Sequence, residues 1–396
     1  MRYILPLRLP VTGEYLEILA CYLMLGVSAA VGVELAAGVV LDNSLLISFG
    51  IGVLFIVLGW KYSYEFIGLF SSDDRVAYEA GLYMKYRALG IPFFLLAVSY
   101  RGFFYGIGHT KIFMFSAIVS YFFNIIFNFL LIFGMYGFPK MGLAGAGLAA
   151  SIGMFLGFIF FLLVTFLPVY RSRYKYYDFF SIGFRHIKKI VQIALPVSFQ
   201  NILVLLGFLI FVAITGILGT LEQASTQVVI TAMFLSFMPC FGFGITAQTR
   251  VGNALGEHNP TEAHACGTET AKIATVFTFC VGLLFWFAPD VVLKVITTNH
   301  DVINMARPLL KLAGVSQIAY GSGTVLAYAL QSAGATVFVM VVEIMTHWIL
   351  FLPIAYFLGL RYGIQGAWAG FPIYILAYSL ILGFKFRSRS WTKLKV

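Results

Sequence analysis

The chain has 396 residues, of which 61% are hydrophobic, 17% aromatic and only 11% charged, and its mean hydropathy is +0.93. A soluble globular chain of this length cannot expose so much apolar surface to water, so the composition excludes a soluble protein and indicates an integral membrane protein. The formal net charge of +10 does not point to nucleic acid, because the basic residues lie between and after apolar stretches, as in the cytoplasmic loops of membrane proteins.

Apolar stretches long enough for a tilted helix to cross a bilayer core of about 30 Å recur along almost the whole chain. They are continuous, whereas barrel strands alternate apolar and polar residues, so membrane-spanning α-helices are expected. About eleven such stretches can be placed, at residues 15–40, 44–69, 85–108, 112–135, 142–168, 189–217, 225–252, 270–296, 306–331, 335–359 and 364–385.

Two basic segments predict the orientation of the chain. Residues 170–189 contain six basic residues and one acid, and residues 385–396 contain five basic residues and no acid. By the positive-inside rule both segments are expected in the cytoplasm. An even number of spans must then lie between them, and six are expected.

These boundaries predict two lobes. We expect an N-terminal lobe at 1–169 with about five helices, a basic cytoplasmic linker at 170–188, a C-terminal lobe of six helices at 189–385 and a basic cytoplasmic tail at 386–396. Five spans would place the N-terminus outside, although Arg2 and Arg8 favour the cytoplasm. We therefore expect that the first helix of a six-helix half is missing or truncated.

Three blocks of the first half reappear in the same order in the second half, which predicts an internal pseudo-two-fold repeat. The matched blocks are Gly26–Gly38 with Gly244–Gly256, Gly106–Met114 with Ser332–Met340, and the GxxGA sequences at Gly142 and Gly363. The fold class expected is an all-α integral membrane protein, a two-lobed bundle of about eleven helices. Such paired halves are typical of transporters, whose substrate site lies between the halves near the bilayer midplane.

No catalytic or metal centre is predicted. The cysteines show neither a CxxC sequence nor metal-ligand spacing, and the six histidines are scattered without an HExxH or a recognisable Ser/His/Asp grouping. We therefore expect no enzyme activity and no cofactor.

The sequence from Ile217 to Ala263 resembles the seventh and eighth helices of the multidrug and toxic compound extrusion (MATE) family. The matching motif includes Arg250, Gly252 and Gly256 and the polar turn that follows. The turn at Tyr100–Lys111 is similar to the RGxGDT-type turn of that family, and the resemblance extends from about Tyr22 to the C-terminus.

This resemblance implies a secondary antiporter that exports organic cations, drugs or other amphipathic small molecules in exchange for protons or sodium ions. It also implies a family pattern of six plus six helices and a multi-pass location in a membrane, with the bacterial inner membrane as the first expectation. A monomer without nucleic-acid partners is expected. We expect the chain to depart from the family by lacking most of the first helix, which in many members carries an acidic coupling residue, and it has His109 where the family turn has an aspartate.

Two carboxylates lie well within apolar spans and are the candidates for ion coupling. A charge inside a membrane helix costs roughly 2.5 to 3.5 kcal/mol on insertion scales, so such residues are often functional. Glu343 has apolar neighbours on both sides and His347 at i+4, whereas Glu34 lies near the cytoplasmic end of its span. The alternatives are that Glu343 bonds His347 or another helix to fix packing, and that Glu34 reaches water.

Five polar residues could line a cavity in the C-terminal lobe or serve as hydrogen-bonding contacts between helices. These substrate-cavity candidates are Gln200, Asn201, Gln317, Tyr320 and His347. Pro196 is expected to bend its helix, and Arg250 is more easily explained as an anchor at the membrane edge than as a substrate contact.

Two other functions stay open. Flippases for lipid-linked or other polyanionic cargo share a related two-lobed design, but the spans here contain almost no Lys or Arg away from their ends. The second alternative is a chain that folds without pumping, either because it is a degenerate paralogue or because it is truncated at its N-terminus.

Overall fold

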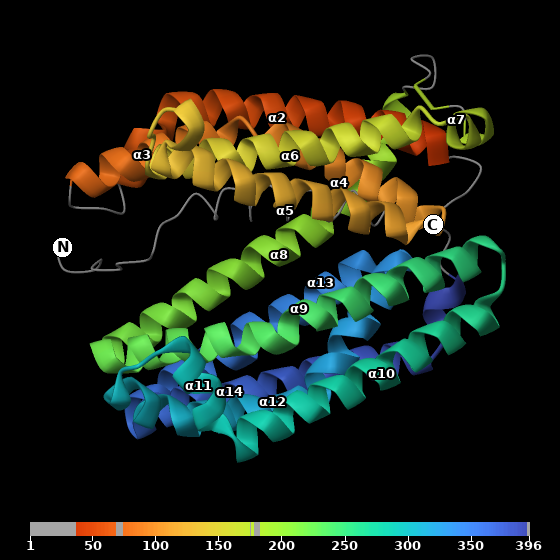
Figure 1. Ribbon diagram of the computed structural model, residues 1–396. Helices are drawn as coiled ribbons and strands as arrows, with labels where there is room; N and C mark the ends of the chain where they lie inside the picture. Colours follow the sequence, from red (N-terminus) through yellow and green to blue (C-terminus); the bar gives the residue numbers. More distant parts are fainter. Residues whose placement is uncertain (1–36, 69–73, 175, 178–182, 394–396) are drawn as a thin grey trace. The chain divides into compact units, whose positions relative to one another are not determined.

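The computed structural model describes residues 37–68, 74–174, 176–177 and 183–393. Within these residues all regular secondary structure is helical (Figure 1). Seven helices are long and apolar enough to cross a membrane, or eight if the bent pair α3 and α4 forms one span. The expected all-helical membrane fold is confirmed, while the expected span at 15–40 lies almost wholly outside the described residues.

The chain divides into two compact units, Met1–Ser198 and Phe199–Val396. The first unit contains α2 (Ala37–Gly68), α3 (Asp74–Ala88), α4 (Ile91–Gly106), α5 (Thr110–Phe133), η2 (Met135–Gly137), α6 (Leu143–Thr165), α7 (Pro168–Tyr174) and the start of α8 (Phe184–Leu218). The second contains the rest of α8, then α9 (Thr220–Gly256), α10 (Pro260–Phe287), α11 (Pro289–Ile296), α12 (His300–Ser332), α13 (Thr336–Ile344), η4 (Met345–Phe351), α14 (Leu352–Arg387) and η5 (Ser390–Lys393).

Two expected spans are corrected by the structure. The stretch 85–108 is divided between α3 and α4, which are bent by 45°, and Pro92 near the start of α4 is a residue that favours a helix beginning. The stretch 270–296 is divided between α10 and α11. Pro289 begins α11, because a proline cannot donate the backbone hydrogen bond that a continuous helix needs.

Part of the predicted linker is packed into the first unit. Tyr176 is buried, and its hydroxyl donates to the backbone oxygen of Thr165 at the end of α6. The Tyr177 hydroxyl lies 2.7 Å from that of Tyr100 on α4, and its backbone N–H donates to Asp42 of α2 at 2.8 Å. The described part of the linker therefore ties three helices together, in addition to connecting the two halves of the sequence.

The start of α8 packs with the first unit and its end with the second. Ile190 and Ala194 join a hydrophobic cluster with Phe55 and Leu95, whereas Phe211 belongs to the large cluster of the second unit. Pro196 lies inside this helix, two residues before the unit boundary at Ser198. A proline removes one intrahelical hydrogen bond and is a common cause of bends, so the bend at Pro196 stays a prediction.

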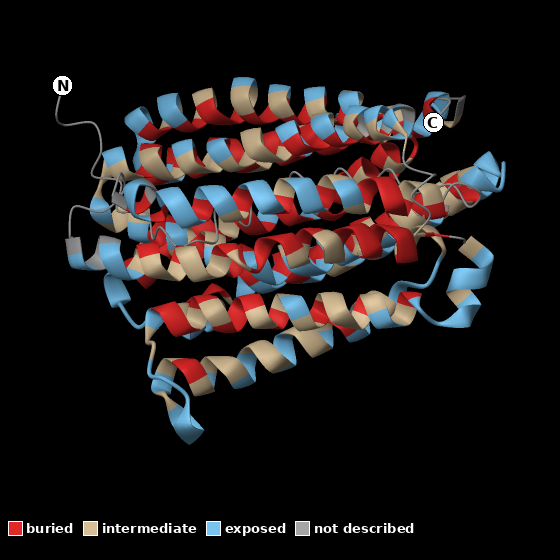
Figure 2. Cartoon of the chain, turned by 90° about the horizontal axis from the view of Figure 1, so that it is seen from above, coloured by how far each residue is buried: buried red, intermediate tan, exposed pale blue. Residues whose placement is uncertain are grey.

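In the second unit, α12 packs against α9, α10 and α14. Buried residues lie on most sides of this helix, and it is less apolar than its neighbours. This explains why α12, expected to span at 306–331, is not among the seven helices above: protein surrounds much of it, so its polar residues need not face lipid. The burial pattern is shown in Figure 2, where buried residues alternate with exposed ones along the long helices.

The sequence repeat has a counterpart in the backbone at two turns. Gly108 and Gly334 both adopt a left-handed conformation, with φ of 78° and 81°. The backbone N–H of the residue after each glycine donates to the backbone oxygen five residues earlier: His109 donates to Phe104 at 2.8 Å, and Ala335 donates to Leu330 at 3.0 Å.

The second pair is Gly142 and Gly363, with φ/ψ of 57°/−128° and 65°/−155°. Gly363 breaks the 52-residue helical segment Thr336–Arg387 between the expected spans 335–359 and 364–385. The match of Gly26–Gly38 with Gly244–Gly256 stays a prediction, because residues 26–36 lie outside the described residues.

Close contact between α10 and α12 predicts a stability effect. A Cβ atom on Gly282 would lie 2.7 Å from the backbone oxygen of Gly314, which cannot move like a flexible side chain. We expect Gly282→Ala to destabilise the protein by about 1–3 kcal/mol, measured as a lower unfolding midpoint in detergent. Gly242→Ala in α9 is the control, because no atom lies within 4 Å of its Cβ position. Equal midpoints for the two variants would show that the helices are not in this contact.

Candidate ion-coupling site

Glu343 is a buried carboxylate within a span of the second unit. It lies on α13 with 6% of its surface exposed, and Tyr374 of α14 donates its hydroxyl hydrogen to Glu343 Oε1 at 2.5 Å. The Tyr378 hydroxyl, one helical turn further along α14, also interacts with this carboxyl. Hydrogen-bond donors from a neighbouring helix thus offset the cost of taking a carboxyl group out of water.

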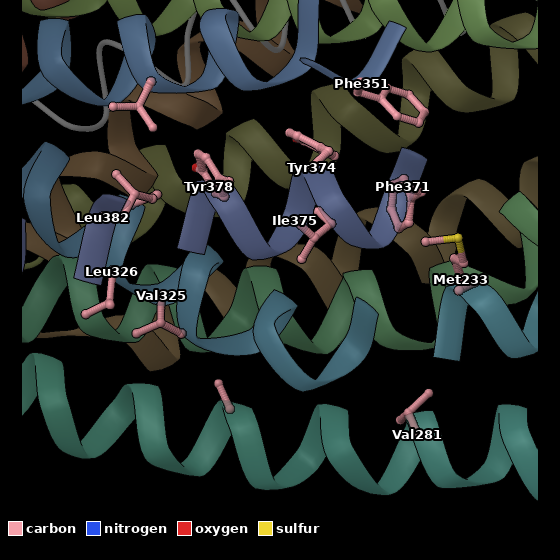
Figure 3. Close-up of a cluster of buried hydrophobic side chains, with 14 of the residues drawn as sticks. Met233, Val281, Val325, Leu326, Phe351, Phe371, Tyr374, Ile375, Tyr378 and Leu382 are labelled. Carbon is pink, nitrogen blue, oxygen red and sulfur yellow. The ribbon is translucent and has the colours of Figure 1, made fainter. Parts of the chain in front are cut away.

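Three tyrosines lie near this carboxyl, and phenylalanine rings pack beside them. Figure 3 shows Phe371, Tyr374 and Tyr378 along α14, with Phe351 above them. The Tyr374 and Tyr378 rings lie 6.2 Å apart, and Tyr320 of α12 interacts electrostatically with Glu343. The environment is therefore apolar apart from a few hydroxyl groups, as expected for a ligand or ion site inside a helix bundle.

Of the two packing partners expected for Glu343, the hydrogen bond to His347 is not formed, whereas a bond to another helix is present. The structure gives Glu343 a partner on α14 instead, while both ring nitrogens of His347 lack a hydrogen bond within the described residues. The π-helical segment η4 begins at Met345. A π-helix has a wider turn than an α-helix, so the i+4 residue no longer lies directly over residue i, which was the basis of the prediction.

His347 is held by aromatic packing. Its side chain is fully buried, and its ring lies 5.2 Å from that of Phe208, 5.3 Å from Phe351 and 5.1 Å from Tyr374. The ring also lies directly against Gly207 of α8. A buried imidazole without hydrogen bonds is unusual, because most buried polar side chains have at least one partner.

The polar cavity candidates mostly contact other helices. Gln331 of α12 donates to Gln200 Oε1 at 3.2 Å, and Ser236 of α9 donates to Gln317 Oε1 at 2.5 Å. The Tyr320 ring lies 4.7 Å from that of Phe237. The structure therefore brings Tyr320 close to Glu343, and it places His347 against Tyr374, which bonds Glu343. Gln200 and Gln317 have their hydrogen-bond partners elsewhere.

The other candidate residues lie apart from this group. Asn201 is half-buried on α8, Arg250 is exposed in the last turns of α9, and Gly256 ends that helix. Gly252 faces Ser332 at the end of α12. Glu34 lies outside the described residues.

Tyr374 and Tyr378 are the site residues that the sequence analysis missed. Their spacing of i and i+4 within the last apolar span places both on one helix face, and this signal could have identified them. Within the described residues no group of three or more His, Cys, Asp and Glu side chains is placed to hold a metal ion.

Comparison with known proteins identifies related chains. The family model described as MatE matches residues 19–130 and 196–357. A probable multidrug resistance protein NorM of Thermotoga maritima is 25% identical over 356 residues, covering 89% of this chain and 76% of that protein. The multidrug resistance protein PmpM of Pseudomonas aeruginosa is 27% identical over 368 residues, covering 89% of this chain and 75% of that protein.

Solved structures share the fold. A multidrug resistance MATE family transporter of the MOP superfamily in an outward-facing conformation superposes with a TM-score of 0.85 at 18% identity, covering 97% of this chain and 88% of that one. A MOP superfamily transporter from Pyrococcus furiosus gives a TM-score of 0.84 at 18% identity, covering 96% and 86%.

The contact between Gly207 and His347 predicts a rescue experiment. Gly207→Ala would place a Cβ atom on the imidazole ring, and we expect it to destabilise the protein by about 1–3 kcal/mol. In a His347→Ala background the same change should cost nothing, or stabilise by about 0.5–1 kcal/mol through the better helix propensity of alanine. Unfolding midpoints of the four proteins measure the coupling. Additive effects would contradict the contact.

Proposed function

The chain belongs to the MatE family, a family of transporters and not of enzymes, and we propose its function from this premise. The proposed activity is secondary antiport, in which organic cations, drugs or other amphipathic small molecules leave the cytoplasm in exchange for protons or sodium ions. Support comes from the relatives in Thermotoga maritima and Pseudomonas aeruginosa, whose names describe multidrug resistance.

The buried contact between Glu343 and Tyr374 is the observation that supports coupling most directly. An ionised carboxylate can only accept hydrogen bonds, whereas a protonated carboxyl has an O–H to donate. Binding or loss of one proton therefore changes which hydrogen bonds Glu343 can make with Tyr374. A sodium ion would have the same carboxylate and the phenol oxygens as ligands, because hard cations prefer oxygen.

The surroundings suit a lipophilic cation. Tyr320, Tyr374 and His347 provide aromatic surface near the carboxylate, and such rings attract cations over their faces. Gln200, Asn201 and Gln317 remain proposed cavity residues. For Gln200 and Gln317 this role requires that a ligand exchange the existing bonds to Gln331 and Ser236.

We further propose the topology that the basic residues predict. The linker at 170–188 and the tail at 386–396 lie in the cytoplasm, the N-terminal lobe comprises 1–169 and the C-terminal lobe 189–385, and the protein spans the inner membrane of a bacterium. Alternating access is the expected transport mode.

Transport of a fluorescent organic cation tests this function. An efflux-deficient bacterial host that expresses the chain should accumulate less dye than the empty host, and the difference should vanish when the driving ion gradient is collapsed. Separate collapse of the proton gradient and omission of sodium distinguish the two coupling ions. A normally inserted chain that never lowers dye accumulation would favour the non-pumping paralogue or a different cargo.

Substitution of the buried carboxyl tests its role. We expect Glu343→Gln to reduce gradient-driven export to the level of the empty host, because an amide neither exchanges protons near neutral pH nor carries charge. The matched control is Glu269→Gln on α10, an exposed carboxylate paired with Lys272 at 2.8 Å, which should leave export unchanged. Undiminished, gradient-dependent export by Glu343→Gln at equal expression would exclude Glu343 as the coupling residue.

A further inference from the structure

A polar cavity lies where the C-terminal segment folds back against the start of α10. Its volume is about 470 Å³, within the range of roughly 300–1,000 Å³ typical of small-molecule sites. It is lined by Pro260, Thr261, Ser388, Arg389, Ser390 and Thr392. All these residues belong to the second unit, and none is part of the site around Glu343.

The walls of this cavity are held in place by an aromatic stack. Trp391 is fully buried, its ring stacks on Phe386 at 4.8 Å, and its indole N–H donates to the Phe386 backbone oxygen at 2.8 Å. On its other side Phe386 stacks on His264 of α10 at 5.0 Å. The segment after α14 is therefore fixed to α10, although its composition alone predicted only a solvated basic tail.

The chemistry of the cavity suits an anion with several oxygen atoms. Arg389 contributes a guanidinium group for which no ion pair is found within the described residues. Ser388, Ser390 and Thr392 add hydroxyl groups. Ser388 and Thr392 donate to the backbone oxygens of Lys385 and Arg389, at 2.7 and 2.9 Å, and the Ser388 and Ser390 hydroxyls lie 3.0 Å apart, so each hydroxyl has to turn its one hydrogen away from its present partner to donate to a ligand. The acid in the first turn of α10, Glu262, accepts a bond from the Asn259 side chain at 3.0 Å. Guanidinium and hydroxyl donors together are the usual partners of phosphate.

The depth of the cavity favours a lipid as the source of that phosphate. Phe384, on the turn before the cavity, is 73% exposed and Ile381 is also exposed, as expected where a helix faces the bilayer. The cavity follows directly, at the end of this span. On the topology proposed above, this level is that of the cytoplasmic leaflet, whose anionic headgroups attract basic segments beside membrane helices.

We propose that this cavity binds the phosphate group of an anionic phospholipid, with Arg389 as the main contact and the hydroxyl groups of residues 388, 390 and 392 as further donors once they exchange their present bonds for bonds to the phosphate. The site is separate from the transport site. It would attach the end of α14 and the start of α10 to the same lipid headgroup.

Titration of the purified full chain in uncharged detergent tests the proposal. The probes are dihexanoylphosphatidylglycerol, dihexanoylglycerol, which lacks the phosphate, and inorganic phosphate. We expect the phosphatidylglycerol to bind and the dihexanoylglycerol not to bind. Arg389→Gln should weaken binding about tenfold or more, because hydrogen bonds to charged groups contribute about 1.5–3 kcal/mol. The matched control is Arg387→Gln in the same segment, which does not line the cavity and should change the affinity less than about threefold.

The outcomes separate the possible ligands. Binding of inorganic phosphate with the same dependence on Arg389 would support the anion site and assign it to a soluble phosphate compound. Equal effects of Arg387→Gln and Arg389→Gln would overturn the proposal, since they would indicate general attraction by the basic tail. Absence of phosphatidylglycerol and phosphate binding, in a chain with an unchanged unfolding midpoint, would also overturn it.

Discussion

One buried carboxyl group, inside a helix bundle whose outer surface faces lipid, constrains how the helices of the second unit pack. Glu343 cannot be solvated by water from within the bundle, so a neighbouring helix has to supply hydrogen-bond donors, and Tyr374 does so from α14. This requirement fixes the rotation of α14 relative to α13. The rings of Phe351, Phe371 and Tyr378 in turn pack against Tyr374, and Figure 3 shows these four aromatic side chains near one another.

The class of fold and the number of halves could be predicted because their signals are local. Continuous apolar stretches predict spanning helices without knowledge of any contact. The glycines at 108 and 334, and those at 142 and 363, could be matched because their positive φ angles favour glycine wherever the same turn is repeated. Pro289 likewise indicates a helix boundary, and attention to it would have ended the predicted span 270–296 at residue 288.

The partners of the site could not be predicted, because they depend on contacts between distant segments. Glu343 and His347 are four residues apart, and the α-helical spacing predicted a contact that the π-helical turns of η4 remove. Tyr374 comes from 31 residues further along the chain. The buried position of Trp391 was equally inaccessible, because a single tryptophan in a basic tail gives no pattern from which packing can be inferred.

The contact between Gly207 and His347 restricts the evolutionary history of the chain. A side chain at position 207 and a ring at position 347 compete for the same space, so substitutions at the two positions are expected to be coupled. A larger residue at 207 beside the histidine passes through an overpacked state, whereas glycine at 207 tolerates either a ring or a smaller side chain at 347. The least costly order of change therefore acquires the glycine before the imidazole beside Tyr374 and loses it after the imidazole.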